Sequence, residues 1–389
     1  MSIRIFKGLR KIALPALAFA LALFVSGLII AFSDPKVLHL ARSPLKFLSS
    51  ALSAAGNAYL ALFQGAIYDP NLAHNGIWNG FYPLSETMVS AAPLILAGLS
   101  VALAFKAGLF NIGAQGQFIF GAIGASVVGF KVNLPIGIHV VAALLVGMAF
   151  ASIWGGFVGL LKARTGAHEV IVTIMLNYIA GYFLLWLLGT TPFLRRGRKD
   201  PIAPEVHVTA RLPHLAGPNM RINFGIIIAL CAAGGVWFLL NRTTWGFRFR
   251  AVGANAAAAR TAGISVAAVT TSIMAIAGAL AGLGGAVQVL GSQFALTSGI
   301  GGSFGFDAIT VALLGRANPI GTVFAAILFG GLRAGGLTMQ SNTDTPLDLI
   351  LIIQALVVLF IAAPAVVKAV FRMKALQADA GVVSKGWNG

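Results

Sequence analysis

Long apolar runs with almost no charges recur along this chain, and they limit its fold more than any other feature. Residues 136–161 and 266–290, for example, contain no charged side chain. A helix of about 20 apolar residues spans the hydrocarbon core of a bilayer. The runs lack the alternation that marks strands of an outer-membrane barrel. Only 10% of all residues are charged, against about 25% in soluble domains. The sequence therefore predicts an all-α integral membrane protein.

Hydropathy predicts about ten transmembrane helices. The eighth and ninth are short and flanked by glycine, so one of them is a candidate for a re-entrant or broken element. The predicted spans are Ile12–Phe32, Glu86–Phe105, Leu109–Phe130, Ile136–Leu161, Val170–Leu188, Ile222–Leu240, Val266–Leu290, Phe306–Leu314, Ile320–Leu332 and Leu347–Ala363.

Basic residues in the loops predict the orientation of these spans. One side holds most of the 27 Lys and Arg residues, which places the N-terminus and the C-terminus in the cytoplasm by the positive-inside rule. The basic stretch Arg195–Asp200 falls outside, in a long loop where the rule has less weight. Residues Ala31–Ser33 resemble a signal-peptide cleavage site. The apolar core before them is longer than the roughly 7–15 residues of a signal peptide, so we expect a retained first helix.

The chain is expected to divide into four parts. They are an N-terminal transmembrane helix (1–33), an external loop with an amphipathic helix (34–85), a membrane core (86–365) and a cytoplasmic tail (366–389). The external loop has apolar residues at helical spacing among Lys, Arg and Ser, as an interfacial helix would. A lid over the helix bundle and a contact with an external partner protein both explain it. The core contains a cytoplasmic segment at 241–265.

Motifs for enzymatic chemistry are missing from the sequence. It contains no phosphate-binding loop of the Gly-x-x-x-x-Gly-Lys-Ser/Thr type, so ATP would have to bind elsewhere. Its six histidines are scattered and its one cysteine is Cys231, so no metal site is predicted. Ten acidic residues provide no relay of buried carboxylates, which argues against a proton-driven secondary transporter. The dispersed basic residues favour contact with anionic lipid and not with nucleic acid.

The stretch Gly108–Ser126, "GLFNIGAQGQFIFGAIGAS", is unusual because it places amides among apolar residues. An amide without a partner in an apolar medium costs on the order of 2–7 kcal/mol. Small residues let helices approach closely, and amides can hydrogen-bond across such contacts. We therefore expect both faces of this helix to be shielded from lipid. Helical geometry predicts two stripes, one of Gly113, Gln117, Gly121 and Gly124, and an opposite one of Asn111, Gln115, Phe118 and Ala122.

Other polar side chains in the predicted spans have two interpretations. Asn177, Tyr178 and Gln288 could hydrogen-bond between helices or line a cavity. Asp307 follows the glycine-rich "SGIGGSFGF", and we expect it to cap the eighth helix, because a carboxylate is favoured at the positive end of the helix dipole.

The segment after the sixth span, "NRTTWGFRFRAVGANAAAARTAGISV", has the features of a short helix on the membrane surface. Asn255 is predicted to cap this helix, residues 256–261 to form it, and Gly263 to end it in the left-handed conformation. Three arginines, Arg248, Arg250 and Arg260, would then face water or an acidic partner. An ordinary interfacial loop is the alternative.

Four motifs in this chain resemble one family of transport proteins. "RAVGANAAAARTAGI" resembles the cytoplasmic coupling segment of permease subunits from binding-protein-dependent ABC importers of the ribose, branched-chain amino acid and nucleoside type. "AGLFNIGAQGQFIFGA", "HEVIVTIMLNYIA" and "GSFGFDAITVALLGRANPIGTVFAAILFGG" are similar to its nucleoside and simple-sugar branch. One departure is Gln115, where that branch often has glutamate.

The resemblance implies partners and a mechanism. A separate ABC ATP-binding subunit would clamp the coupling segment, and a solute-binding protein (periplasmic or a lipoprotein) would deliver solute. A second, homologous permease would complete the pore in the bacterial cytoplasmic (inner) membrane. No cofactor is expected on this chain, since ATP would be hydrolysed on the partner. The residues implied for ATPase coupling are Arg248, Arg250, Gly253, Asn255, Arg260 and Gly263.

The solute follows from the same motifs and from the absence of charge among the candidate residues. Asn111 and Gln115 would line the translocation route, or serve only as bonds between helices. Amides, hydroxyls and rings suit a neutral solute, because an ion would want a charged partner in a low dielectric. Nucleosides are favoured, with Phe118, Tyr178 and Trp186 available for stacking on a base. Simple sugars are the alternative solute, and a secondary transporter without an ATPase is the alternative class.

Overall fold

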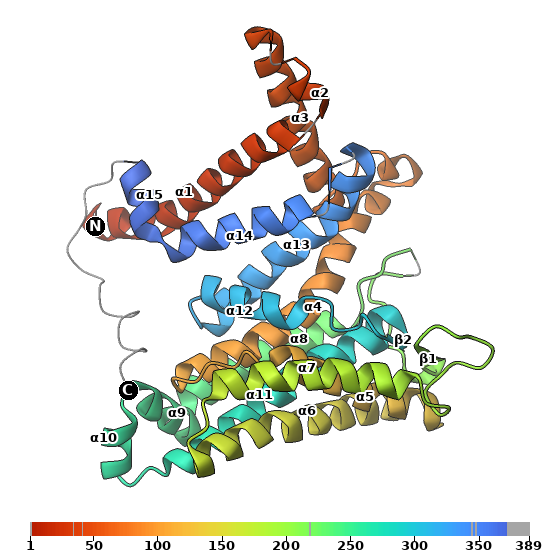
Figure 1. The fold of residues 1–389 in the computed structure, drawn as a ribbon, viewed down its shortest axis with the longest axis vertical. Helices are drawn as coiled ribbons and strands as arrows, with labels where there is room; N and C mark the ends of the chain where they lie inside the picture. Colours follow the sequence, from red (N-terminus) through yellow and green to blue (C-terminus); the bar gives the residue numbers. More distant parts are fainter. Residues whose placement is uncertain are drawn as a thin grey trace. The chain divides into compact units, whose positions relative to one another are not determined.

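The computed structural model describes residues 2–33, 35–40, 42–217, 219–343, 345–346 and 348–371. Nearly all of its regular structure is helical, as expected. The chain forms two compact units, one of residues up to Pro70 and from Leu332 onward, the other of Asn71–Gly331. Figure 1 shows the elements of each unit.

The first unit contains helices from both ends of the chain. Its elements are α1 (Ser2–Ser33), α2 (Pro35–Leu38), α3 (Pro44–Ala66), the end of α13, α14 (Asp348–Ala362) and α15 (Pro364–Val370). Helix α1 packs against α3 and α14. The Tyr59 hydroxyl of α3 donates a hydrogen bond to the Leu23 carbonyl of α1. Helix α3 lies within the segment for which an amphipathic helix is predicted.

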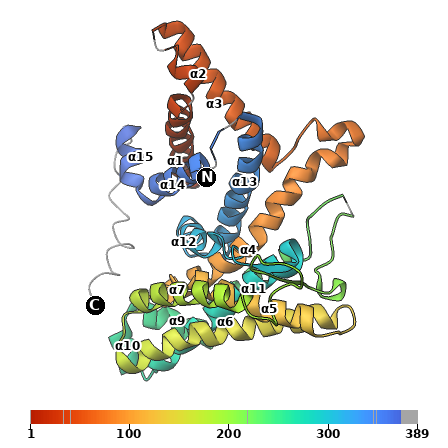
Figure 2. The ribbon, with the colours of Figure 1, turned by 45° about the vertical axis from the view of Figure 1, so that its right-hand side comes forward.

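The second unit is a bundle around the long helix α11. Helix α11 packs against α4, α5 and α6, and Figure 2 shows α5, α6 and α11 side by side. Its elements are η1 (Leu72–Asn75), η2 (Ile77–Phe81), α4 (Tyr82–Lys106), α5 (Ala114–Lys131), α6 (Ile138–Thr165), α7 (Glu169–Leu188), β1 (Ile202–Glu205), η3 (Val208–Ala210), α8 (Gly225–Arg242), α9 (Thr244–Ala254), α10 (Ala256–Thr261), α11 (Val266–Gln288), the π-helical turn η4 (Val289–Gln293), β2 (Ala295–Thr297), α12 (Phe304–Leu314) and the part of α13 (Pro319–Thr343) up to Gly331.

Glycines bring the helices of this bundle into backbone contact. A Cβ added at Gly121 of α5 would collide with the backbone of Gly282 in α11. At Gly124 it would lie 3.0 Å from the Val146 carbonyl oxygen of α6, and at Gly113 it would lie 2.9 Å from Cγ2 of Thr173 in α7. The predicted small-residue stripe therefore meets three different helices. Close approach of this kind replaces the hydrophobic driving force that lipid removes.

Six helices within the described residues are long and apolar enough to cross a membrane. They are Ile77–Lys106, Ile138–Thr165, Glu169–Leu188, Gly225–Arg242, Val266–Gln293 and Pro319–Thr343. Three shorter apolar helices are Leu17–Ser33, Phe304–Leu314 and Asp348–Ile361. Ten crossings and two cytoplasmic termini therefore stay predictions, and residues 372–389 of the expected tail lie outside the described part.

Three of the predicted spans differ at one end by five residues or more from the helices that the structure shows. The first was expected from Ile12, but α1 begins at Ser2. The third was expected from Leu109, but α5 begins at Ala114, and the residues before it form a turn. The ninth was expected to end at Leu332, but α13 continues to Thr343. The glycines around Arg333 pack closely: a Cβ at Gly336 would collide with Ile350. Arg333, which follows the last residue of the predicted ninth span, is therefore part of a helix long enough to cross a membrane.

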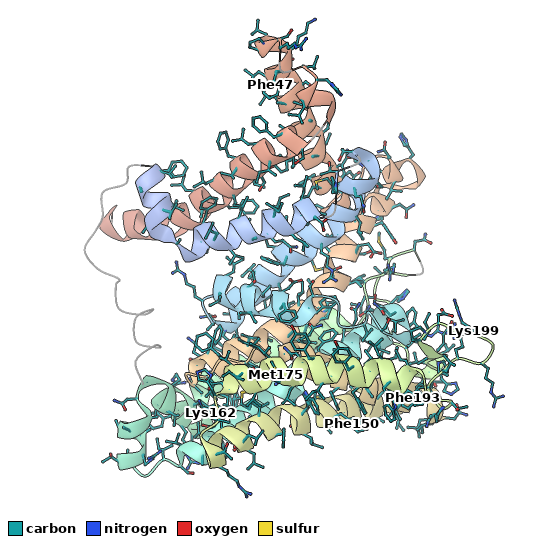
Figure 3. The ribbon with its side chains drawn as sticks, viewed as in Figure 1. Phe47, Phe150, Lys162, Met175, Phe193 and Lys199 are labelled. Carbon is teal, nitrogen blue, oxygen red and sulfur yellow. The ribbon has the colours of Figure 1, made fainter. Side chains whose placement is uncertain are left out.

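The coupling-like segment and the basic loop lie at opposite ends of the second unit. Figure 3 shows Lys162 at the end that carries α9 and α10, and Lys199 at the other end. The loop after α7 is folded, because β1 pairs antiparallel with β2. Glu205 forms ion pairs with Arg195 at 3.0 Å and with Arg211 at 2.9 Å. The hydrogen bond and charge of Arg195 lower the pKa of this carboxyl.

Candidate functional site

A sharp turn joins α4 to α5 and begins the unusual amide-containing stretch. The Leu109 amide donates to the Ala104 carbonyl at 3.0 Å, and the Gly108 amide donates to the Phe105 carbonyl at 3.1 Å. With Gly108 at φ +72°, this is the Schellman pattern that ends a helix at a left-handed glycine. Helix α4 stops here for that reason, and the seven residues 107–113 connect it to α5.

A reciprocal pair of amides follows the turn. Asn111 is completely buried. Its Nδ2 donates to Gln117 Oε1 at 2.9 Å and to Ser100 Oγ at 3.0 Å, while Gln117 Nε2 donates back to Asn111 Oδ1 at 3.1 Å. The expectation that Asn111 and Gln117 lie on opposite stripes is therefore wrong. Asn111 precedes the helix, so helical spacing does not apply to it.

Two more amides tie α5 to distant parts of the chain. Asn177 of α7 donates from Nδ2 to the Ile112 carbonyl at 2.9 Å and accepts from the Gly116 amide at 2.8 Å. Gln115 donates from Nε2 to the Gly302 carbonyl at 2.9 Å and accepts from the Gly305 amide at 2.8 Å. We call Ser100, Asn111, Gln115, Gln117 and Asn177 the amide cluster. Its side chains link α4, α5, α7 and the start of α12.

The rings proposed for stacking on a solute lie in different surroundings. Phe118 is completely buried and stacks on Phe304 with a centroid distance of 5.3 Å. Tyr178 and Trp186 are each 63% exposed on α7. The structure therefore does not bring these three rings together around one space.

Gln288 differs from the other candidate amides. It is the last residue of α11 and is only 8% exposed. Within the described residues its amide makes no hydrogen bond, whereas those of Asn111, Gln115 and Asn177 are all used. The π-helical turn η4 follows it directly, and such turns occur frequently at functional sites.

The local structure predicted for the coupling-like segment is confirmed. Asn255 accepts a hydrogen bond from the Ala258 amide at 3.0 Å and caps α10, which spans Ala256–Thr261. Gly263 has φ +80°. Arg248, Arg250 and Arg260 are exposed, and the Arg248 guanidinium lies 5.4 Å from the centroid of the Trp245 ring.

Gly253 has a role within the bundle that the sequence did not indicate. A Cβ at this position would collide with the Lys106 carbonyl oxygen and lie 2.9 Å from the Ala107 Cα. The end of α9 therefore packs backbone to backbone against the turn between α4 and α5.

Asp307 does not occupy the capping position that was predicted for it. Helix α12 begins at Phe304, with Ser303 as the residue before it, and Asp307 lies in the first turn. Its Oδ2 accepts a hydrogen bond from Ser303 Oγ at 2.7 Å. The carboxylate is still near the positive end of the helix dipole.

Two interactions that the sequence analysis missed hold the region around η4. Asn223 donates from Nδ2 to the Gly291 carbonyl at 2.7 Å and accepts from the Gly225 amide at 2.9 Å. Arg221 bridges Glu86 at 3.1 Å and Ser292 at 3.4 Å. The predicted sixth span included Asn223, whereas α8 begins only at Gly225; an asparagine near the start of a predicted helix was the available signal for the first interaction.

Comparisons with known proteins agree with the motifs. The family described as branched-chain amino acid transport system / permease component matches residues 84–362. The guanosine ABC transporter permease NupP of Bacillus subtilis is 39% identical over 80% of this chain and 90% of its own. The glucose ABC transporter permease TsgB13 of Haloferax volcanii is 32% identical over 82% of this chain and 86% of its own. The nucleoside ABC transporter permease NupB of Lactococcus lactis is 33% identical over 83% of this chain and 93% of its own. The Bacillus and Lactococcus strains each have a second, more distant permease among the matches. No solved structure matches the chain.

Proposed function

This chain belongs to the branched-chain amino acid transport system permease family, and we propose that the solute it imports is a nucleoside. Membership of this family makes the chain a multi-pass membrane component of a transporter and not an enzyme. The main support for a nucleoside as the solute is the 39% identity to a guanosine permease over 80% of this chain. The nucleoside permease NupB supports the same class. Simple sugars are the second candidate, favoured by the 32% identity to a glucose permease.

The family implies an ATPase and a solute-binding partner. We further propose that this chain forms one half of the pore and that a homologous permease forms the other. The paired permeases of the Bacillus and Lactococcus strains support this arrangement. ATP would be hydrolysed on the separate subunit, so this chain would hold no cofactor of its own. The complex would lie in the bacterial cytoplasmic membrane with both termini of this chain inside.

The ATPase would dock on α9 and α10. The exposed guanidiniums of Arg248, Arg250 and Arg260 give this surface a positive charge that an acidic rim on the partner would complement. Arg250 and Arg260 have no ion pair within the described residues, so both remain available to a partner. Asn255 and Gly263 support the surface by fixing the two ends of α10.

Gln288 is the amide best suited to contact the solute. An amide offers donors and an acceptor to a neutral, hydrogen-bonding molecule, and the amide of Gln288 is not used within the described part of the chain. Gln288 also lies where α11 passes into the π-helical turn η4, and such turns are frequent at functional sites. Asn111, Gln115 and Asn177 are engaged by protein groups, which favours interhelical bonding for them.

Uptake measurements in a strain that lacks this gene would test the solute. We expect the restored gene to give uptake of labelled guanosine, adenosine or uridine that exceeds uptake of glucose and ribose. Gln288→Leu should reduce that uptake, whereas Gln293→Leu, the same substitution at the exposed last residue of η4, should not. Sugar uptake that depends on the gene, with no nucleoside uptake, would assign the chain to the alternative.

A further inference from the structure

The turn between α4 and α5 is in contact with the proposed ATPase-docking helices at one side and with the amide cluster at the other. We define residues Gly108–Gly113 as the relay turn. Its first residue lies against the end of α9, because a Cβ at Gly108 would be 3.3 Å from the Gly253 Cα. Its other residues carry or receive the hydrogen bonds of Asn111 and Asn177.

The contact between α9 and the relay turn is stiff. It joins main-chain atoms of Gly253 to those of Lys106, Ala107 and Gly108, so no flexible side chain lies between them to absorb a displacement. The turn itself is fixed by its two Schellman hydrogen bonds and by the edge contact of the Phe105 and Phe110 rings, whose centroids are 5.1 Å apart. A shift of α9 must therefore move the turn or break the contact.

Hydrogen bonds continue the connection from the turn into the bundle. The Asn111 side chain is hydrogen-bonded to Gln117 and Ser100. The Asn177 side chain is hydrogen-bonded to the backbone of both Ile112 and Gly116. Within the same stretch Gln115 holds the carbonyl of Gly302 and the amide of Gly305. Those two glycines lie on either side of Ser303 and Phe304, where the short helix α12 begins. Rigid elements joined by hydrogen bonds are the kind of network that carries coupling between distant sites.

We propose that the relay turn transmits movement of α9 and α10 to the amide cluster and so to the start of α12, with Gly253, Gly108 and Gln115 as positioning residues. The amides in this motif thus hold the connection together and do not contact the solute. The inference rests on the proposed function, because it assigns the movement of α9 and α10 to an ATPase.

The test uses the assembled importer in proteoliposomes and measures solute transported per ATP hydrolysed. Gly253→Ala adds a Cβ that the backbone of Lys106 and Ala107, directly before the relay turn, cannot accommodate in place. Gly108→Asn introduces a residue that tolerates the left-handed conformation. Its Cβ would lie 3.3 Å from the Gly253 Cα, which is a milder contact than the one at Gly253. Gly234→Ala on α8 is the matched control, because its Cβ would meet nothing within 4 Å.

We expect Gly253→Ala to lower the transport-to-ATP ratio by about tenfold, Gly108→Asn to lower it less, and Gly234→Ala to leave it unchanged. Gln115→Met should lower the transport-to-ATP ratio as well. The ratio of the double variant Gly253→Ala/Gln115→Met should equal that of the more impaired single variant, because both changes interrupt the same connection.

Three results would overturn the proposal. They are an unchanged ratio in Gly253→Ala, effects that multiply in the double variant, or loss of ATPase co-purification in Gly253→Ala, which would make Gly253 a docking residue. Failure of the proposed function has a different signature: the unaltered complex would then show no ATP hydrolysis stimulated by nucleoside and its binding protein.

Discussion

Replacing Asn111 by leucine tests whether the amide cluster stabilises the bundle. Leucine has a similar branched shape but no polar atom. The change would remove three hydrogen bonds, two to Gln117 and one to Ser100. It would leave the Gln117 amide and the Ser100 hydroxyl in a buried place without these partners. Ser100 itself is completely buried.

The three bonds set the size of the effect. Hydrogen bonds between membrane helices average about 0.6 kcal/mol and reach about 1.7 kcal/mol. Three of them give a loss of roughly 2–5 kcal/mol in the free energy of unfolding for Asn111→Leu. Gln117→Met removes two bonds and should cost about 1–3 kcal/mol.

The double variant Asn111→Leu/Gln117→Met distinguishes a hydrogen-bonded pair from two separate packing positions. When both partners of a buried bond become apolar, the cost of leaving a polar group without a partner disappears. We therefore expect the double variant to be less destabilised than the sum of the single variants, with a coupling of about 1–2 kcal/mol. Reversible unfolding of the purified protein in bicelles would measure it. Strict additivity would refute the paired geometry.

Three further predictions concern topology, the helix α13 and the folded loop. The orientation can be tested in intact cells with single cysteines placed in a variant that lacks Cys231. An impermeant thiol reagent should label a cysteine that replaces Gly197 and should not label one that replaces Ala257. The reverse pattern would show that the chain has the opposite orientation. Arg333→Met should reduce uptake about tenfold and Arg333→Lys less, because ionised groups within spans are retained for function; full uptake by the methionine variant, with normal membrane levels, would contradict this. The lowered pKa of Glu205 means that its bonds to Arg195 stabilise the loop above the unfolded-state pKa and are lost as the pH falls through the folded one. The protection of the β1 amides against hydrogen exchange, taken relative to the intrinsic exchange rate at each pH, should therefore fall in acid, and Glu205→Gln should show no such acid-dependent change.

Local signals in the sequence predicted local structure well. The helix 256–261 was predicted with its cap and its terminating glycine, because Asn255 and Gly263 act on residues within one turn of themselves. The motif at Gly108 misled for the same reason. Its apolar residues continue the hydropathy of a span, but the left-handed glycine ends α4, and the chain turns before α5 begins.

Partners distant in the sequence could not be predicted in this way. The amides were recognised as needing partners, but the sequence does not show that Gln115 would meet residues near 302–305 or that Asn177 would meet Gly116. The extent of α13 was missed because glycines beside Arg333 resemble a helix end. In a membrane bundle, glycine also marks close packing, as Gly336 against Ile350 shows.

The geometry around Gln115 explains why an amide suits this position where the related branch often has glutamate. The side chain must accept a hydrogen bond from the Gly305 amide and donate one to the Gly302 carbonyl. An amide supplies both without a charge. An ionised glutamate would keep the first bond but would turn the second into a repulsion between two oxygens, and only a protonated glutamate could restore it. In this chain the link from α5 to α12 therefore needs no proton, which fits transport driven by ATP on a partner and not by a proton gradient.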